Sequence, residues 1–213
     1  MVLQNKARKT ALMGMFAAII FILAFTPNIG FIPLPHMRAT IVHIPVIIGS
    51  ILLGVKFGMV LGFLFGLTSL INNTMAPTPL SFVFSPFIPA PGADSGSPLA
   101  LIVCFVPRIL VGVFPWLVYN GLKKLLNNRA DILCLTISGI AGSLTNTLFV
   151  MHLIFFLFRD YYAEVRNIAV DAVYGVVLSI IAINGIPEAV VAAVITAAVC
   201  VPLKIVQKRQ ARV

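Results

Sequence analysis

Long apolar stretches alternate with short polar connections along the chain. Their pattern predicts six membrane-spanning helices, near residues 10–27, 40–55, 57–72, 99–122, 132–157 and 185–205. A helix needs about 20 mostly apolar residues to span a hydrocarbon core about 30 Å thick. We therefore expect an all-α integral membrane protein in which residues 1–213 form a single membrane domain.

A further apolar stretch, at about residues 168–183, does not fit as a seventh span. If it crossed the membrane, the basic tail KIVQKRQARV would face the side opposite to the other basic segments. We expect a re-entrant or surface segment on the outer side, before the last helix. Such a backbone is tolerated at membrane depth where protein buries it or where it lines a cavity.

The composition supports a membrane protein, since only 10% of the residues are charged and the mean hydropathy is +1.08. The net charge of +9 could indicate nucleic acid, but the basic residues follow the topology. With the N-terminus inside, eleven of them lie in cytoplasmic segments, one lies in the membrane, and the outer segments hold Arg38, Arg159 and Arg166. Positive charge accumulates on the cytoplasmic side, so we expect both termini there and no nucleic-acid partner.

Known catalytic and metal-binding patterns are missing from the sequence. It contains no HExxH, GxSxG or Walker A motif, and the cysteines Cys104, Cys134 and Cys200 have no CxxC spacing. They are typical of small core residues. The basic-then-apolar N-terminus has no convincing cleavage site and is expected to stay as the first span. We expect a protein that is not an enzyme and that binds no metal or cofactor itself.

Several polar residues lie inside the predicted spans. Arg108 interrupts the apolar segment CFVPRILVGVF, and an arginine at the centre of a spanning helix costs about 2.5–3.5 kcal/mol on insertion scales. Counting about 1.5 Å per residue puts Arg108, Asn146, Asn184, Glu188 and His43 in the outer half of one bundle. Such residues indicate a functional site, and the planar guanidinium favours an anionic small molecule as ligand.

A purely structural role for these residues is an open alternative. Arg108 would then pair with Glu188, and the asparagines would hydrogen-bond between helices. His43, near a helix start, is more often satisfied locally. The loop NNTMAPTPLSFVFSPFIPAPGADSGSP contains Phe82, Phe84 and Phe87, too many aromatics for a disordered linker. We therefore expect this loop to fold over a site.

Small residues lie on one face of two spans. On the third span these are Gly54, Gly58, Gly62 and Gly66, a spacing that favours close packing between helices. On the first span they are Ala11, Gly14 and Ala18. That face either packs inside the bundle or docks on another membrane protein.

The sequence resembles the substrate-binding S components of energy-coupling factor (ECF) vitamin transporters, most closely the pantothenate-specific branch. The resemblance rests on KTALMGMFAAIIFILAF, GFIPLP, ATIVHIPVIIGSILLGVKFGMVLGFLFGLTSL, CFVPRILVG and NGIPEAVVAAVI, which together cover most of the chain. It implies a multi-pass protein of a prokaryotic plasma membrane with six helices, cytoplasmic termini and a vitamin pocket near the outer surface. The first and third connections, around residues 28–38 and 73–98, would cover this pocket.

The resemblance also implies partners. A transmembrane T component (EcfT) would dock on the first helix at Ala11, Gly14 and Ala18, although the family's AxxxA spacing is not kept here. Two ATPases (EcfA and EcfA') would bind ATP and magnesium, and the loaded subunit would topple in the membrane to release the vitamin. Arg108 would hold the carboxylate of pantothenate, with Asn146, Asn184 and Glu188 binding the polar remainder.

Other functions stay open at this point. The ligand could be pyridoxine, hydroxymethylpyrimidine, folate or another anion. A stand-alone gradient-driven transporter is a second possibility, although the two halves of the chain show no internal repeat. An intramembrane enzyme that uses His43 or His152 is a third.

Overall fold

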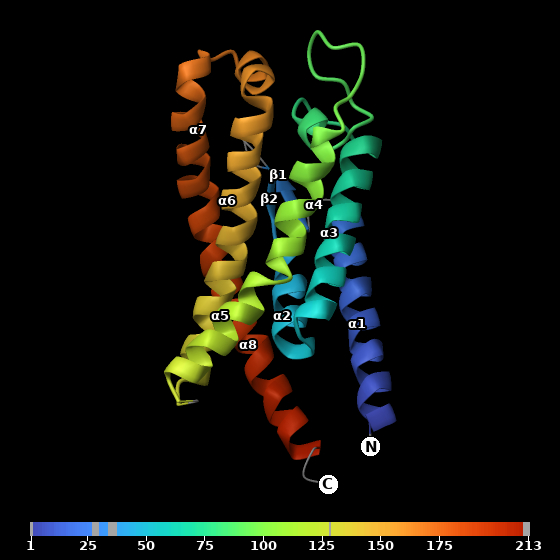
Figure 1. The fold of residues 1–213 in the computed structure, drawn as a ribbon, viewed down its shortest axis with the longest axis vertical. Helices are drawn as coiled ribbons and strands as arrows, with labels where there is room; N and C mark the ends of the chain where they lie inside the picture. The colour runs from blue at the N-terminus through green and yellow to red at the C-terminus, as the bar shows by residue number, and fades with distance from the viewer. Residues whose placement is uncertain (1, 27–29, 34–37, 128, 211–213) are drawn as a thin grey trace.

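The computed structural model describes residues 2–26, 30–33, 38–127 and 129–210. Its helices form an elongated bundle, and both chain ends lie at the same end of the molecule (Figure 1). We call the opposite end, which carries the loop 76–98 and the turn after α6, the distal end.

Six helical columns form the bundle and match the six predicted spans. They are α1 (Val2–Phe25), α2 (His43–Leu53), α3 (Val55–Met75), the bent pair α4 (Leu99–Val111) and α5 (Phe114–Leu125), α6 (Asp131–Arg166), and the joined pair α7 (Val173–Ile180) and α8 (Ile186–Gln210). In the part of the chain that the structure describes, five columns are long and apolar enough to cross a membrane, and α2 is shorter. The expectation of a helical membrane protein is confirmed at this level.

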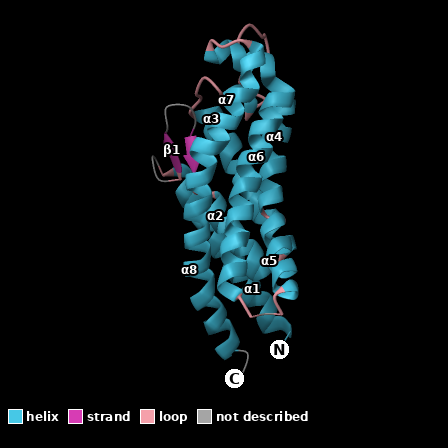
Figure 2. Ribbon diagram, turned by 90° about the vertical axis from the view of Figure 1, so that its left-hand side faces the viewer, coloured by secondary structure: helices cyan, strands magenta, loops and turns pink. Residues whose placement is uncertain are grey.

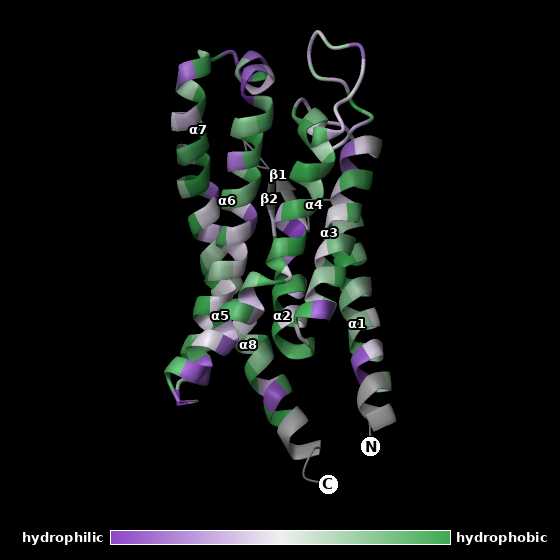
Figure 3. Cartoon of the chain, viewed as in Figure 1, coloured by the Kyte–Doolittle hydropathy of each residue, from purple (hydrophilic) through white to green (hydrophobic). Residues whose placement is uncertain are grey.

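The surface of the bundle suits a lipid environment. Figure 3 shows hydrophobic segments along the middle of the bundle, with hydrophilic residues mostly toward its two ends. Large apolar side chains are exposed on several helices, among them Ile22, Leu117, Phe156 and Val194. A soluble monomer rarely exposes so much contiguous apolar surface. The three cysteines are buried and free, as expected for core residues.

The second predicted span is shorter than expected, with 11 helical residues where 40–55 was predicted. Before it, β1 (Phe31–Pro33) pairs antiparallel with β2 (Arg38–Thr40), a two-stranded hairpin that the all-α prediction did not include. The prolines of GFIPLP explain this, because they disfavour helix in the residues before them. The 11 residues of α2 rise about 16 Å. Figure 2 shows the hairpin at the edge of the bundle, on the distal side of α2.

Residues 168–183 belong to the last helical column. The short turn η2 (Val170–Ala172), α7, the π-helical turn η3 (Ile181–Gly185) and α8 follow one another, and Val170–Val206 forms one apolar segment of 37 residues. A re-entrant segment would turn back toward the side from which it came, so this continuous helix does not show the predicted re-entrant segment, and the surface alternative stays a prediction. Pro187 lacks the N–H for a helical bond, and a π-turn accommodates this without ending the helix.

Close backbone contact joins α3 to α4. A Cβ atom added at Gly62 would overlap the backbone of Arg108, and one at Gly58 would overlap Gly112. Gly66 faces the ring of Phe105 in the same way. The predicted packing face is therefore confirmed for three of the four glycines. The fourth, Gly54, has φ 102° and turns the chain from α2 into α3, a conformation that favours glycine.

The longest helix, α6, bends near its distal end. Phe158 has φ −137° and ψ 19°, outside the helical range, and the helix resumes after it. The last two turns, residues 159–166, run across the distal end of the bundle, and Figure 1 shows them almost end-on. The helix ends at Asn167, whose φ of 52° is left-handed. We call residues 159–166 the bent end of α6.

Candidate ligand-binding cavity

A cavity of about 480 Å³ lies in the distal half of the bundle. Its walls come from α3, α4, α6, η3 and α8, and Thr40 of β2 also contributes. Small-molecule sites typically occupy about 300–1,000 Å³. The cavity is therefore large enough for a vitamin-sized ligand.

Four of the five polar residues predicted for the site line this cavity. Arg108 comes from α4, Asn146 from α6, Asn184 from η3 and Glu188 from α8. The first three are 5%, 5% and 7% exposed. Because buried polar side chains normally have partners, their convergence on one open volume indicates a binding site.

Arg108 is held between two aromatic rings. Its guanidinium carbon lies 5.5 Å from the ring centroid of Phe65 and 5.1 Å from that of Phe84, distances typical of cation–π contacts. One terminal nitrogen donates a 2.7 Å hydrogen bond to the carbonyl of Val103. Its Nε is buried and has no hydrogen-bond partner in the described part of the chain. The guanidinium is fixed in position and keeps donors for a ligand.

Glu188 is bonded to neighbours other than Arg108. Its Oε1 accepts a 2.8 Å hydrogen bond from the backbone N–H of Thr40, and its Oε2 accepts a 3.1 Å bond from the hydroxyl of Thr147. Arg108 and Glu188 are both among the described residues and do not form an ion pair; pairs that are formed include Lys123–Asp131, Arg159–Asp160 and Lys204–Asp131. The Arg108–Glu188 pair of the structural alternative is therefore not formed here. Glu188 instead ties the hairpin to α8 and α6.

The two asparagines offer hydrogen-bonding groups of both kinds. The Oδ1 of Asn146 is buried without a hydrogen-bond partner among the described residues. Asn184 lies in η3, and π-turns within helices are frequent at functional sites. An amide side chain both donates and accepts. The pair therefore suits a ligand with hydroxyl or amide groups.

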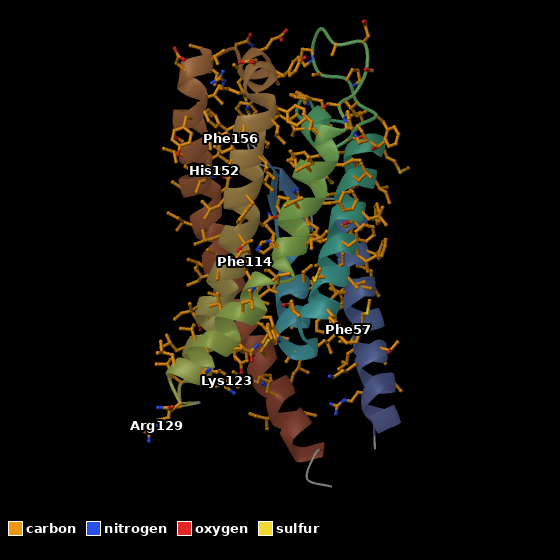
Figure 4. The ribbon with its side chains drawn as sticks, in the orientation of Figure 1. Phe57, Phe114, Lys123, Arg129, His152 and Phe156 are labelled. Carbon is orange, nitrogen blue, oxygen red and sulfur yellow. The ribbon has the colours of Figure 1, made fainter. Side chains whose placement is uncertain are left out.

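His43 does not line the cavity. Its imidazole is fully buried at the start of α2, and the described cavity wall does not include it. His152 is half-buried on α6, with its ring 6.2 Å from that of Tyr174 and 6.5 Å from that of Phe156. Figure 4 shows His152 and Phe156 in the distal half, beside α7.

The loop 76–98 folds over the cavity, as predicted. Thr78, Pro79, Leu80 and Phe84 line it, and the 3-10 turn η1 (Ser81–Val83) is buried. The ring of Phe82 packs 5.9 Å from that of Phe158 on α6. Ser81 donates a 2.9 Å bond to Asn73 of α3. Phe87 is 70% exposed and takes no part in this packing. Of the first connection, residues 28–29 and 34–37 lie outside the described residues.

Several lining residues were missed by sequence reasoning, among them Thr40, Thr147 and Arg166. Thr40 and Thr147 lie on the wall and bond to Glu188, Thr40 through its backbone N–H and Thr147 through its hydroxyl. A backbone bond does not depend on residue type, and threonine hydroxyls are too common in helices to stand out. Arg166, counted as an outer-loop charge, reaches the cavity from the bent end of α6. Its guanidinium carbon lies 5.6 Å from the ring centroid of Tyr162. No sequence signal marked the bend that brings it there.

The small residues of α1 face outward. Ala11, Gly14 and Ala18 are all exposed, and a Cβ added at Gly14 would meet no atom within 4 Å. Of the two predicted alternatives, packing inside the bundle does not hold for this face. The other alternative, a docking surface for another membrane protein, is compatible with this exposure.

Fold and cavity together define a class: a helical membrane protein of several apolar helices with a ligand-sized cavity that buried polar side chains line. The family model described as "ECF transporter, substrate-specific component" matches residues 8–200. The chain belongs to this family, and it is therefore a transporter component of the plasma membrane and not an enzyme.

Two curated relatives are similar over nearly their whole length. Pantothenic acid transporter PanT of Lactococcus lactis subsp. cremoris is 37% identical over 200 residues, which cover 92% of this chain and 93% of that protein. Pantothenate transporter PanT of Leuconostoc mesenteroides subsp. mesenteroides is 27% identical over 201 residues, with 92% and 91% covered.

Proposed function

We propose that this chain is the pantothenate-binding S component of an ECF transporter and serves pantothenate uptake. The observation that carries the proposal is the convergence of Arg108, Asn146, Asn184 and Glu188 on one cavity of about 480 Å³. The two relatives named as pantothenate transporters support the choice of ligand.

The chemistry of pantothenate fits these groups. The molecule has one carboxylate, one amide and two hydroxyls. Arg108 would bind the carboxylate, because a guanidinium matches its two oxygens. Asn146 and Asn184 would bond to the amide and hydroxyls. Glu188 already accepts two hydrogen bonds, but a carboxylate has about four acceptor positions, so it would also accept from a ligand hydroxyl.

Uptake would need partner subunits, as the family implies. A T component (EcfT) would dock on the exposed small face of α1, and two ATPases (EcfA and EcfA') would bind ATP and magnesium. The driven step would be a toppling of the loaded subunit in the bilayer. His43 is left out of the proposed ligand set, because it does not line the cavity.

The direct test is to identify what the purified protein retains. We expect mass spectrometry of small molecules released by denaturation to find pantothenate, and calorimetry on stripped protein to show one site per chain. Retention of pyridoxine, hydroxymethylpyrimidine or folate in its place would show that the vitamin has been assigned wrongly. Pantothenate uptake that persists without the ATPases would favour a gradient-driven transporter.

The proposed orientation places both termini and the basic connection Lys123–Arg129 in the cytoplasm. Figure 4 shows Lys123 and Arg129 at the end opposite the loop 76–98, as the positive-inside rule requires. Cysteines introduced at Ser95 and at Lys124, both exposed, should react with a membrane-impermeant maleimide from opposite sides. The native cysteines are buried, and the protein without introduced cysteines gives the background labelling. Labelling of both sites from the same side would contradict the topology.

A further inference from the structure

One residue of the cavity wall, Asn72, also holds another helix. It lies in the last turn of α3 and lines the cavity. Its Nδ2 donates a 2.6 Å hydrogen bond to the backbone carbonyl of Ala24 in α1. A carbonyl oxygen can only accept, so this bond fixes which end of the amide faces α1. The Oδ1 accepts no hydrogen bond from the described residues. Asn72 therefore keeps an acceptor for a ligand while its donor is bound to α1.

The next residue, Asn73, shows the contrast. It lines the same cavity, but its Oδ1 accepts a 2.9 Å bond from Ser81 and its Nδ2 donates a 2.8 Å bond to the carbonyl of Ser69. Both ends of this amide are used within the wall, where they hold the loop 76–98. Of the two neighbouring asparagines, Asn72 is therefore the one with an end available to a ligand.

The helix that Asn72 holds is lightly packed. Among residues 7–25 the buried ones are Phe16, Ile20 and Ala24, a smaller share than in the other four long apolar helices that the structure describes. Figure 1 shows α1 beside α3. The carbonyl of Ala24 lies in the last turn of α1, where carbonyls lack a partner within their own helix. The bond from Asn72 satisfies this carbonyl and joins the distal end of α1 to the cavity wall.

We propose that Asn72 couples the cavity to the distal end of α1, accepting a hydrogen bond from the ligand through Oδ1 while it holds α1 through Nδ2. The inference rests on the proposed function, because it needs a ligand in this cavity. The hydroxyls and amide N–H of pantothenate supply suitable donors. A donor bonded to Oδ1 fixes the side chain and polarises its amide, and linked hydrogen bonds strengthen one another. Ligand binding therefore tightens the hold on α1, the helix that carries the exposed small face.

Hydrogen exchange on the purified full chain in detergent measures this hold. In the wild type we expect saturating pantothenate to slow exchange of the backbone amides of residues 22–26 by roughly threefold to tenfold, the effect of about one hydrogen bond. Asn72→Leu removes both ends of the amide. Exchange at these residues should then be faster without ligand and should not respond to it. Calorimetry should show that the variant still binds pantothenate, about tenfold more weakly at most.

Asn120 provides a matched control. Its Nδ2 also donates to a backbone carbonyl, that of Trp116 at 2.8 Å, but it is exposed on α5 and is not part of the described cavity wall. Asn120→Leu makes the same substitution and should leave both the affinity and the exchange at residues 22–26 unaltered. If Asn72→Leu does not fold, Asn72→Ala replaces it under the same criteria.

The outcomes separate the two proposals. A wild type that does not bind pantothenate overturns the proposed function, and the coupling with it. A wild type that binds pantothenate without slower exchange at residues 22–26 overturns the coupling alone. Equal slowing in Asn72→Leu also overturns it, and would indicate another route, such as the close contact of Gly30 with the carbonyl of Leu23. An equal effect of Asn120→Leu does the same. If neither Asn72 variant folds and binds pantothenate, the role of Asn72 is purely structural.

Discussion

Replacing Arg108 by alanine is expected to weaken pantothenate binding by about 30-fold or more, because a desolvated charge-assisted contact is worth on the order of 2–5 kcal/mol. Arg108 is 5% exposed, and its guanidinium is already positioned by Phe65, Phe84 and the carbonyl of Val103. The side chain would therefore lose little conformational entropy when it binds the ligand. Calorimetry with pantothenate on the purified variant measures the effect.

Arg108→Lys tests geometry separately from charge. An ammonium keeps the positive charge but lacks the planar fork, so we expect weaker binding than in wild type and stronger binding than in Arg108→Ala. Melting temperatures in detergent show whether the variants fold. The competing ion-pair hypothesis requires that Arg108→Ala destabilise the protein and that added Glu188→Gln restore it. Unchanged affinity together with such a rescue would give Arg108 a purely structural role.

The set of cavity residues could be predicted because depth in a membrane helix follows from counting. At about 1.5 Å per residue, Arg108, Asn146 and Glu188 all fall in the outer half of the bundle, on different helices. The high cost of polar groups in hydrocarbon made each of them stand out. The structure adds what counting does not give, namely that these side chains face a common cavity.

The sequence did not determine in which direction a side chain points around its helix axis. His43 has a suitable depth, but the direction of its side chain depends on where α2 begins. The helix begins at His43 itself, after a hairpin, so the register expected from a span over 40–55 does not apply. The imidazole is buried away from the described cavity wall.

The sequence also did not predict where a helix bends or where it continues through a π-turn. The bend at Phe158 occurs in FFLFRDYYAEVR, which contains neither proline nor glycine, the residues that usually mark a kink. The packing of Phe82 from the loop 76–98 against Phe158 accompanies the bend, and such a contact between distant segments is invisible in local sequence. Arg166 was missed for this reason. At 168–183 the position of the basic tail led us to predict a re-entrant or surface segment, whereas a π-turn joins this stretch to the last helix.

Gly14→Leu is expected to abolish pantothenate uptake while leaving pantothenate binding intact. Helices approach closely in a bilayer where both faces carry small residues, and Ala11, Gly14 and Ala18 form an exposed face of this kind. A Cβ added at Gly14 meets no atom within 4 Å, so a leucine there begins in open space, and lipid solvates it well. The fold and cavity should therefore be unaffected, whereas docking of the T component should be blocked.

Gly175→Leu is the matched control for this experiment. Gly175 is also an exposed helical glycine with no atom within 4 Å of an added Cβ, but it lies on α7. The control variant therefore carries the same glycine-to-leucine change at a position outside the proposed docking face. Three measurements decide: co-purification with the T component and ATPases, uptake of labelled pantothenate by cells, and affinity in detergent. Equal loss of uptake in both variants would remove the special role of α1. Loss of binding in Gly14→Leu alone would show that this face supports the cavity and not a partner.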